Sequence, residues 1–268
     1  MNPLPISVCT ISGAEAGRIA RALSSVAGWA SEMIVVLNQE VRDGTEEIAR
    51  KHGARVYREP WKGYIAQKNS AAEKAACPWI MDVDADEAVS RELRDEIRSV
   101  VEGGAAEGID AFSVPRLSWY CGRWIRHGDW YPDRQTRLWR RGRAHWGGVD
   151  PHAILQVSGR VKKLKADLHH FSRESINVHL QKIAPFSDEF VRQHAGDPEP
   201  GLFEMAARPM WRFLRAYFLR LGFLDGWPGF YIAAHTAFGT LVRYAKLREA
   251  RLGQSSAPSP PGLERQNA

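Results

Sequence analysis

The stretch Trp79-Ile80-Met81-Asp82-Val83-Asp84-Ala85-Asp86-Glu87 is a short apolar run that ends in acids. Residues 79–83 predict a buried strand, and the acids after them predict the exposed loop at its carboxyl end. Open α/β sheets place their ligands at that end of the strands. Asp84 and Asp86 can both reach one hard divalent cation, and bound Mg²⁺ or Mn²⁺ can hold a diphosphate. An acidic loop that only faces solvent is the alternative interpretation.

Strand and helix patterns alternate on the N-terminal side of this stretch. Apolar runs predict strands at residues 6–11, 33–37 and 54–57, and helical spacing predicts helices at residues 19–26 and 45–52. This alternation indicates an α/β fold with a Rossmann-like, mostly parallel sheet and flanking helices. The chain has neither G-x-G-x-x-G nor G-x-x-x-x-G-K-[ST], so carboxylates that hold a metal are the remaining familiar device for binding phosphate.

The composition limits the classes of partner and compartment. The 268 residues carry a net charge of +6, which suggests an anionic partner such as nucleic acid, a phospholipid surface or a phosphorylated substrate. The three cysteines form no C-x-x-C pair, so we expect no disulfide framework or zinc ribbon and a reducing, cytoplasmic location. No stretch reaches the roughly 20 apolar residues of a membrane span. Residues 253–268 are rich in Pro and Ser and predict a disordered tail.

Several ordered motifs together resemble the family 2 glycosyltransferases of the GT-A fold, and in particular bacterial lipopolysaccharide-core β-glucosyltransferases. The first two are W-K-G-Y-x-x-Q-K-N at residues 61–69 and the acidic stretch at residues 79–87. The resemblance continues at residues 130–140, 146–152, 169–171 and 223–229. It implies a GT-A-like catalytic domain at residues 1–172, followed by C-terminal amphipathic helices at residues 173–252.

The resemblance also implies a nucleotide-sugar site. In such enzymes the second Asp of D-x-D, here Asp86, binds the metal, and the first, Asp84, contacts the sugar nucleotide and is assigned to the metal as well. Asn38 stands where many members carry an Asp, so this chain departs from the family at that position. The other expected donor-binding residues are Thr10, Ile11, Gln67, Lys68, Asn69 and Arg137. For residues 67–69 a solvated helix start is the alternative.

Asp150-Pro151-His152 follows a Gly-Gly turn and supplies two candidates for the catalytic base. A carboxylate and an imidazole can each take the proton of an acceptor hydroxyl. Relatives place an acid directly after the His, where this chain has Ala153. We favour Asp150 as the base and expect His152 to orient the acceptor or touch the donor phosphates.

The C-terminal third predicts two helices, at residues 175–194 with a break near Pro185, and at residues 208–220. The second helix interleaves arginines with aromatic residues, a pattern that suits an anionic membrane interface. A helix that simply packs on the catalytic domain, with its arginines in water, is the alternative.

The resemblance implies a hexosyltransferase that depends on Mg²⁺ or Mn²⁺ and inverts the anomeric carbon. Its expected partners are a nucleotide-sugar donor, a glycan or lipid-linked acceptor of the cell envelope and the anionic cytoplasmic face of the inner membrane, without nucleic acid. Two alternatives remain open: a nucleotidyltransferase on a similar fold, and a basic adaptor of membranes or nucleic acid that has no catalytic activity. An adaptor should show no Mg²⁺- or Mn²⁺-dependent binding of nucleoside diphosphate. A nucleotidyltransferase should carry a Gly-rich phosphate loop near the first strand, and residues 11–15 match such a loop poorly.

Overall fold

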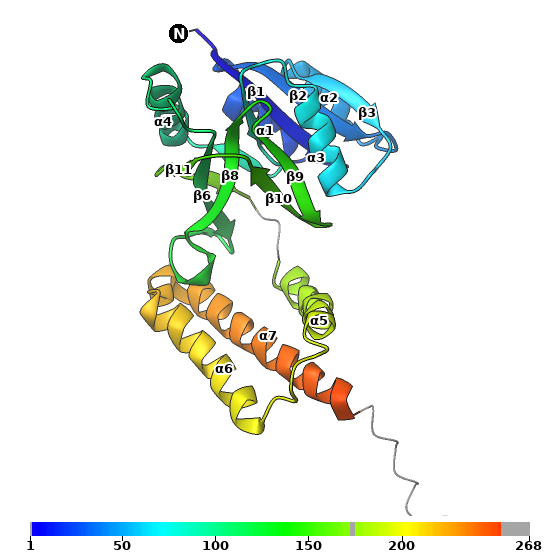
Figure 1. Cartoon of the computed structure of the whole chain (residues 1–268), viewed down its shortest axis with the longest axis vertical. Coiled ribbons are helices and arrows are strands. Elements are labelled where there is room, and N and C mark those ends of the chain that lie inside the picture. Colours follow the sequence, from blue (N-terminus) through cyan, green and yellow to red (C-terminus); the bar gives the residue numbers. More distant parts are fainter. Residues whose placement is uncertain (1, 172–174, 253–268) are drawn as a thin grey trace, which may run out of the picture. The chain divides into compact units, whose positions relative to one another are not determined.

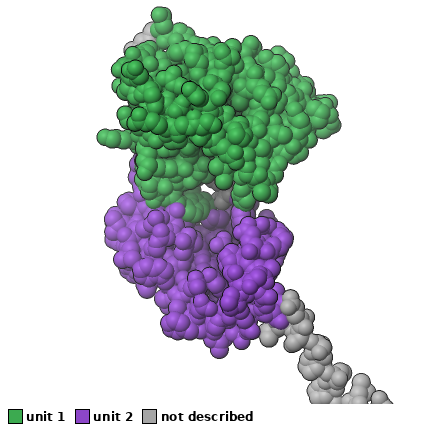
Figure 2. Space-filling view, in the orientation of Figure 1, with its two compact units in different colours: residues 1–124, 130–172 green, residues 125–129, 173–268 purple. Residues whose placement is uncertain are grey.

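The computed structural model describes residues 2–171 and 175–252, so the predicted tail at residues 253–268 lies outside the described residues. The chain forms two compact units, which Figure 2 shows in different colours. One comprises residues 1–124 and 130–172, and we call it the sheet unit. The other comprises residues 125–129 and 173–268, and we call it the helical unit.

The sheet unit is built on a single mixed sheet with the strand order β3-β2-β1-β4-β8-β6-β12-β5, to which β7 and β11 add through β6. Strands β1 to β4 run parallel, and β8 lies antiparallel between β4 and β6. The mostly parallel α/β sheet expected from the sequence is therefore confirmed. Its strands are β1 Leu4–Ser12, β2 Ala30–Asn38, β3 Arg55–Glu59, β4 Trp79–Asp82, β5 Glu87–Val89, β6 Ala111–Tyr120, β7 Arg123–Ile125, β8 Asp133–Arg140, β11 Val161–Lys163 and β12 Leu168–His170.

Helices cover both faces of this sheet because successive side chains of a strand point to opposite faces (Figure 1). In β1, Val8 packs in one core cluster with Ala22 and Val26 of α1. The next residue, Cys9, packs in another cluster with Ala71 of α3. The helices of this unit are α1 Ile19–Val26, α2 Thr45–Lys51, α3 Tyr64–Glu73 and α4 Arg91–Glu102, and a separate hairpin pairs β9 Ala144–Val149 with β10 His152–Val157.

The chain after β4 differs in one respect from the sequence prediction. Glu87 was expected in an exposed acidic loop, but it lies in β5 and is wholly buried. That expectation is wrong because Glu87 pairs with Arg137 of β8, at 2.6 Å between Oε1 and Nη2. Ser90 is the N-cap of α4, since its Oγ accepts a hydrogen bond from the Leu93 N–H at 3.0 Å.

The helical unit contains α5 Ile176–Gln193, α6 Leu202–Leu214, a π-helical turn at Arg215–Leu219, a 3-10 turn at Gly222–Asp225 and α7 Gly226–Leu252, and a further 3-10 turn spans Gly128–Trp130. The break predicted near Pro185 is wrong, because α5 continues through that proline. The predicted helix at residues 208–220 starts earlier and changes to the π-helical turn. Within the described residues, no helix is both long and apolar enough to cross a membrane.

Two carboxylates with little exposure, those of Asp225 and Asp129, join residues 125–129 to the rest of the helical unit. Asp225 accepts hydrogen bonds from the backbone N–H groups of Arg126 and His127, at 3.0 and 2.8 Å. Asp129 forms ion pairs with Arg212, Arg215 and Arg220, at 2.9, 3.1 and 3.1 Å. A segment far away in the sequence thus supplies the carboxylate on which three arginines of α6 and the turn after it converge.

Candidate active site

A cavity of about 850 Å³ opens at the carboxyl ends of the parallel strands. Ile11 near the end of β1, Asn38 at the end of β2 and Asp84 just after β4 all line it. Asp86 of the acidic loop and His152 of the β9–β10 hairpin line it as well. The sheet therefore brings together residues that are far apart in the sequence, at the edge where this class of fold binds ligands.

A network of buried ion pairs forms one wall of the cavity. Lys68 of α3 places its Nζ 2.7 Å from Asp82 Oδ2 and 2.6 Å from Asp84 Oδ1. Arg137 of β8 pairs with Asp82, lies 2.6 Å from Asp84 Oδ2 and is bound to Glu87 by the contact given above. Each carboxylate oxygen of Asp84 therefore faces a cation.

Mutual attraction favours the charged forms of Asp84 and Lys68 although both groups are largely out of water. Burial on its own would raise the pKa of Asp84, but the charges of Arg137 and Lys68 outweigh burial and hold that pKa well below its usual range. Burial would lower the pKa of Lys68, yet the carboxylates of Asp82 and Asp84 raise it. Asp84 is thus a charged acceptor in a fixed orientation, with 31% of its side chain exposed to the cavity side.

Asp86 lies in a different setting, beside a histidine. His170 of β12 places Nε2 3.6 Å from Asp86 Oδ2, and Arg18 lies 3.5 Å from the same oxygen. The other ring nitrogen of His170 contacts the Ser118 hydroxyl at 3.1 Å, which fixes the orientation of the ring. His169, the preceding residue of the strand, instead packs its ring against Trp124 at 4.5 Å between centroids.

Few side chains in the cavity could act as ligands of a divalent cation. Both oxygens of Asp84 face cations, whereas the Asp86 carboxylate and the His170 imidazole are two neighbouring groups on the cavity wall that could bind a metal ion. In the described part of the chain, no group of three or more His, Cys, Asp or Glu side chains is arranged to hold a metal. Two side-chain ligands are enough for an ion that takes its other ligands from a diphosphate and water, as Mg²⁺ commonly does.

The two candidate bases lie in different places. Both residues are exposed, but His152 lines the cavity, whereas Asp150 binds the start of α3, where its Oδ1 accepts the Ile65 N–H at 3.0 Å. Gly63 is required for this contact, because it has a φ of +89° and an added Cβ would lie 2.0 Å from Asp150 Oδ2. Asp150 therefore acts on the helix N-terminus as a capping group supplied from another element.

The remaining residues predicted to bind the donor divide into two groups. Ile11, Asn38, Lys68, Asp84 and Arg137 line the cavity. Thr10, Gln67 and Asn69 are not among its lining residues. Thr10 donates to the Val83 carbonyl at 2.8 Å, and Asn69 exchanges two hydrogen bonds with the Trp146 backbone at 2.8 and 2.9 Å. Gln67 is buried, with no hydrogen-bond partner for its amide among the described residues.

Sequence reasoning did not select several residues that line the cavity. Arg116 and His170 were passed over, although Arg116 lies 2.6 Å from Asp133 and reaches the buried Glu87 at 3.5 Å. Trp61 and Tyr64 stand in the motif at residues 61–69 and line the cavity at the start of α3. Their rings pack edge to face, with 4.9 Å between centroids. In the sequence, the alternation of side chains along β6 and β12 was the pattern that could have indicated Arg116 and His170 as site residues.

Comparison with known proteins defines the class of this chain. The model of the family described as glycosyl transferase family 2 matches residues 7–156, more than half of the chain. An uncharacterized glycosyltransferase, RP128, from Rickettsia prowazekii (strain Madrid E) is 31% identical over 263 residues, which cover 92% of this chain and 88% of that protein. The chain therefore belongs to glycosyl transferase family 2 and is a glycosyltransferase of the GT-A fold.

Two further likenesses are more distant. The lipopolysaccharide core biosynthesis glycosyltransferase LpsC of Rhizobium meliloti (strain 1021) is 25% identical over 252 residues, covering 91% of this chain and 92% of LpsC. The crystal structure of Staphylococcus aureus TarS residues 1–349 in complex with UDP-GlcNAc aligns with a TM-score of 0.49 at 13% identity, covering 93% of this chain and 92% of that one.

Replacing Asn69 tests whether its side chain serves the fold. Asn69→Ala should lower the free energy of unfolding by about 2 kcal/mol, because the Trp146 N–H and carbonyl both lose their partner. Urea denaturation measures this loss, and Asn177→Ala on the exposed surface of α5 is the matched control. An unchanged midpoint together with weakened donor binding would instead place Asn69 on the donor.

Proposed function

We propose that this glycosyltransferase moves a sugar from a nucleotide-sugar donor to a hydroxyl group of an envelope glycan or lipid-linked acceptor, with inversion at the anomeric carbon. The observation that carries the proposal is the cavity at the strand ends, in which a fixed Asp84 lies beside the Asp86–His170 pair. Membership of family 2 supports the nucleotide-sugar donor. The likeness to LpsC, whose name assigns it to lipopolysaccharide core biosynthesis, supports the envelope acceptor.

The balance of charge supports a divalent cation as cofactor. The cations that line the cavity are already matched by acids: Lys68 and Arg137 face Asp82, Asp84 and Glu87, and Arg116 pairs with Asp133. A donor diphosphate brings further negative charge into this partly buried space. Mg²⁺ or Mn²⁺, held by Asp86 and His170, would supply the positive charge that stabilises the leaving diphosphate.

The protein's own groups position the donor. Asp84 is oriented by two cations and offers carboxylate oxygens to a sugar or ribose hydroxyl. Trp61 and Tyr64, with 46% and 45% of their surfaces exposed, add apolar area on which rings of the donor can pack. Positioning of this kind lowers the barrier because the reacting groups are already oriented before reaction.

The base is proposed on the β9–β10 hairpin. The position of His152 on the cavity wall supports the imidazole, whereas the carboxylate of Asp150 already accepts a hydrogen bond from the start of α3. This geometry argues against the preference for Asp150 that the sequence motif suggested. A neutral imidazole can take the acceptor proton as the new glycosidic bond forms.

Membrane contact is proposed through an outward apolar face of α6. Phe203, Met210, Trp211 and Leu214 recur at helical spacing, and the first three have 83%, 60% and 58% of their surfaces exposed. Such a face can enter the headgroup region of a bilayer without crossing it. The nearby arginines Arg212, Arg215 and Arg220 are bound to Asp129, so their removal would leave a buried carboxylate without partners.

Asp86→Asn should lower turnover at least about a hundredfold, because the residue loses the charge that would bind the cation. In parallel, Mn²⁺ with a nucleoside diphosphate should raise the Tm of the parent and not of the variant. Asp95→Asn, at an exposed acid of α4, is the control. Undiminished turnover of the parent in EDTA would contradict the metal requirement.

Paired substitutions distinguish the two bases. His152→Ala should lower kcat by about 10² to 10⁴ with little change in donor affinity, as expected for a group that acts mainly in the transition state. Asp150→Asn should keep kcat within about tenfold of the parent, because an amide oxygen can still accept the Ile65 N–H. The opposite order, measured by steady-state kinetics, would identify Asp150 as the base.

Polar substitution of the outward face of α6 tests membrane contact. Phe203→Ser with Trp211→Ser should weaken sedimentation with anionic liposomes at least about tenfold, because two large apolar side chains no longer leave water. The control replaces two exposed apolar residues of the sheet unit, Trp119→Ser with Val161→Ser. If the parent does not sediment with liposomes, the face is not a membrane-binding surface.

A further inference from the structure

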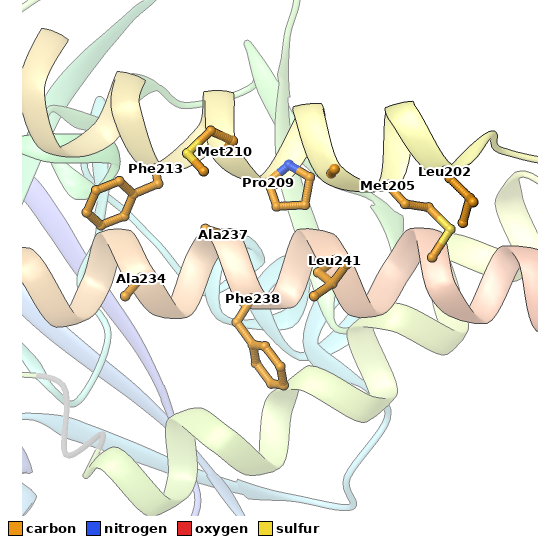
Figure 3. A pocket seen from close by; sticks show the side chains of 10 residues that line it. Leu202, Met205, Pro209, Met210, Phe213, Ala234, Ala237, Phe238 and Leu241 are labelled. Atoms are coloured by element: carbon orange, nitrogen blue, oxygen red, sulfur yellow. The ribbon is translucent and has the colours of Figure 1, made fainter.

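An apolar groove of about 700 Å³ runs between α6 and α7 of the helical unit. Figure 3 shows the side chains of Leu202, Met205 and Phe213 extending from α6 toward α7. All the residues that line the groove are alanine, leucine, methionine, proline or phenylalanine. The groove therefore offers no charge, hydroxyl or amide side chain to the group that covers it.

One side of α7 extends this apolar surface toward the start of that helix. Large apolar side chains recur there at helical spacing and so lie on one side of the helix: Trp227, Phe230, Phe238 and Leu241. They are 60%, 51%, 52% and 37% exposed. A single exposed apolar side chain needs no explanation, but a contiguous set of them marks an interaction surface.

The polar groups of α7 face α5 and not the groove. His235, Thr236 and Arg243 line a separate pocket together with residues of α5. Residues 226–242 contain no Asp, Glu, Lys or Arg. Burial lowers the pKa of His235, which favours its neutral form. Covering the apolar side of α7 would therefore take no charge of this segment out of water.

The apolar side of α7 is continuous with the α6 face to which the proposed function assigns membrane contact. Met210 belongs to both surfaces, since it is 60% exposed on that face and also lines the groove. Phe213 of the groove packs edge to face against Phe230 of α7, with 5.9 Å between ring centroids. One apolar surface therefore spans both helices.

Hydrocarbon matches this surface better than a polypeptide does. Protein interfaces carry roughly one hydrogen bond per 100–200 Å², and the groove lining has no hydroxyl, amide or charged side chain to form one. The exposed Trp227 is of the residue type that is enriched at membrane–water interfaces. Residues 253–268 contain one large apolar side chain, Leu263, which is too little to cover the groove.

We propose that α6 and α7 lie side by side in the surface of a lipid bilayer, with the acyl chains covering the groove. This rests on the membrane contact in the proposed function and deepens it, because it adds the second helix and names the acyl chain as the group that is bound. Arg212, Arg215 and Arg220 already converge on Asp129, so apolar burial and not charge carries the contact.

The test measures binding of the full chain to phosphatidylcholine vesicles without any sugar donor. Trp227→Ser with Phe238→Ser should weaken binding at least about tenfold, because two large apolar side chains no longer leave water. The matched control changes two exposed apolar residues of α5, Ile176→Ser with Leu180→Ser, and should bind like the parent. Both double variants should keep the Tm of the parent, since all four side chains are exposed.

Salt separates apolar burial from charge attraction. The parent should keep most of its vesicle binding in about 1 M NaCl, where attraction between exposed charges is screened within a few ångströms. Loss of binding at this salt concentration would assign the contact to charge and overturn the proposal.

Lipids brominated on their acyl chains report whether the chains reach this surface, because bromine quenches tryptophan fluorescence only at short range. The parent should be quenched more strongly than Trp227→Phe, which keeps an apolar side chain but lacks the indole. Equal quenching would place Trp227 outside the acyl chains and overturn the proposal.

Two further outcomes separate this inference from the contact assigned to α6. If Phe203→Ser with Trp211→Ser loses vesicle binding while Trp227→Ser with Phe238→Ser keeps it, the inference is overturned and the α6 contact stands. A dimer that forms without vesicles, and that the α7 double variant loses, would identify a second copy of the chain as the group that covers the groove. Sugar transfer is not measured, so these outcomes leave the proposed reaction untouched.

Discussion

The buried ion pairs that join Lys68 and Arg137 to Asp82 and Asp84 are the constraint on which the sheet unit depends. They connect α3, β8 and the end of β4, three elements that local sequence does not bring together. Taking such charges out of water is costly, and the cost is offset only while every partner is present. The elements that support the cavity are therefore positioned by the same charges that orient Asp84.

Much of the sheet unit could be predicted because its signals are local. Apolar runs of strand length and helical spacing gave correct strands and helices along the first four parallel strands. Errors arose where a distant partner decides the outcome. Glu87 reads as an exposed acid until Arg137, fifty positions away, is placed beside it. Pro185 does not end α5, because contacts such as Phe190–Tyr244 and Lys246–Asp188 fix that helix against α7.

The sequence predicted where the candidate site lies better than it predicted what each residue does there. Motif position selected the polar residues near the strand ends, yet such residues serve two purposes there. Lys68 and Asp84 face the cavity, whereas Thr10 and Asn69 satisfy backbone groups of neighbouring elements. Sequence cannot separate the two, because in both cases a hydroxyl, amide or charge is required beside a strand end. His170 needed the pairing of β12 with β6 and β5 before its approach to Asp86 became visible.

The position of Asp129 in the chain limits how the helical unit can be produced as a separate fragment. The residues of the helical unit are not contiguous: the chain enters this unit at residue 125, leaves it after residue 129 and returns to it after residue 172. A fragment cut out at the second entry would carry Arg212, Arg215 and Arg220 without the carboxylate on which they converge. Like charges left together repel each other, so such a fragment would lose cohesion where α6 ends. A C-terminal fragment that begins after residue 172 therefore does not contain the whole of the helical unit.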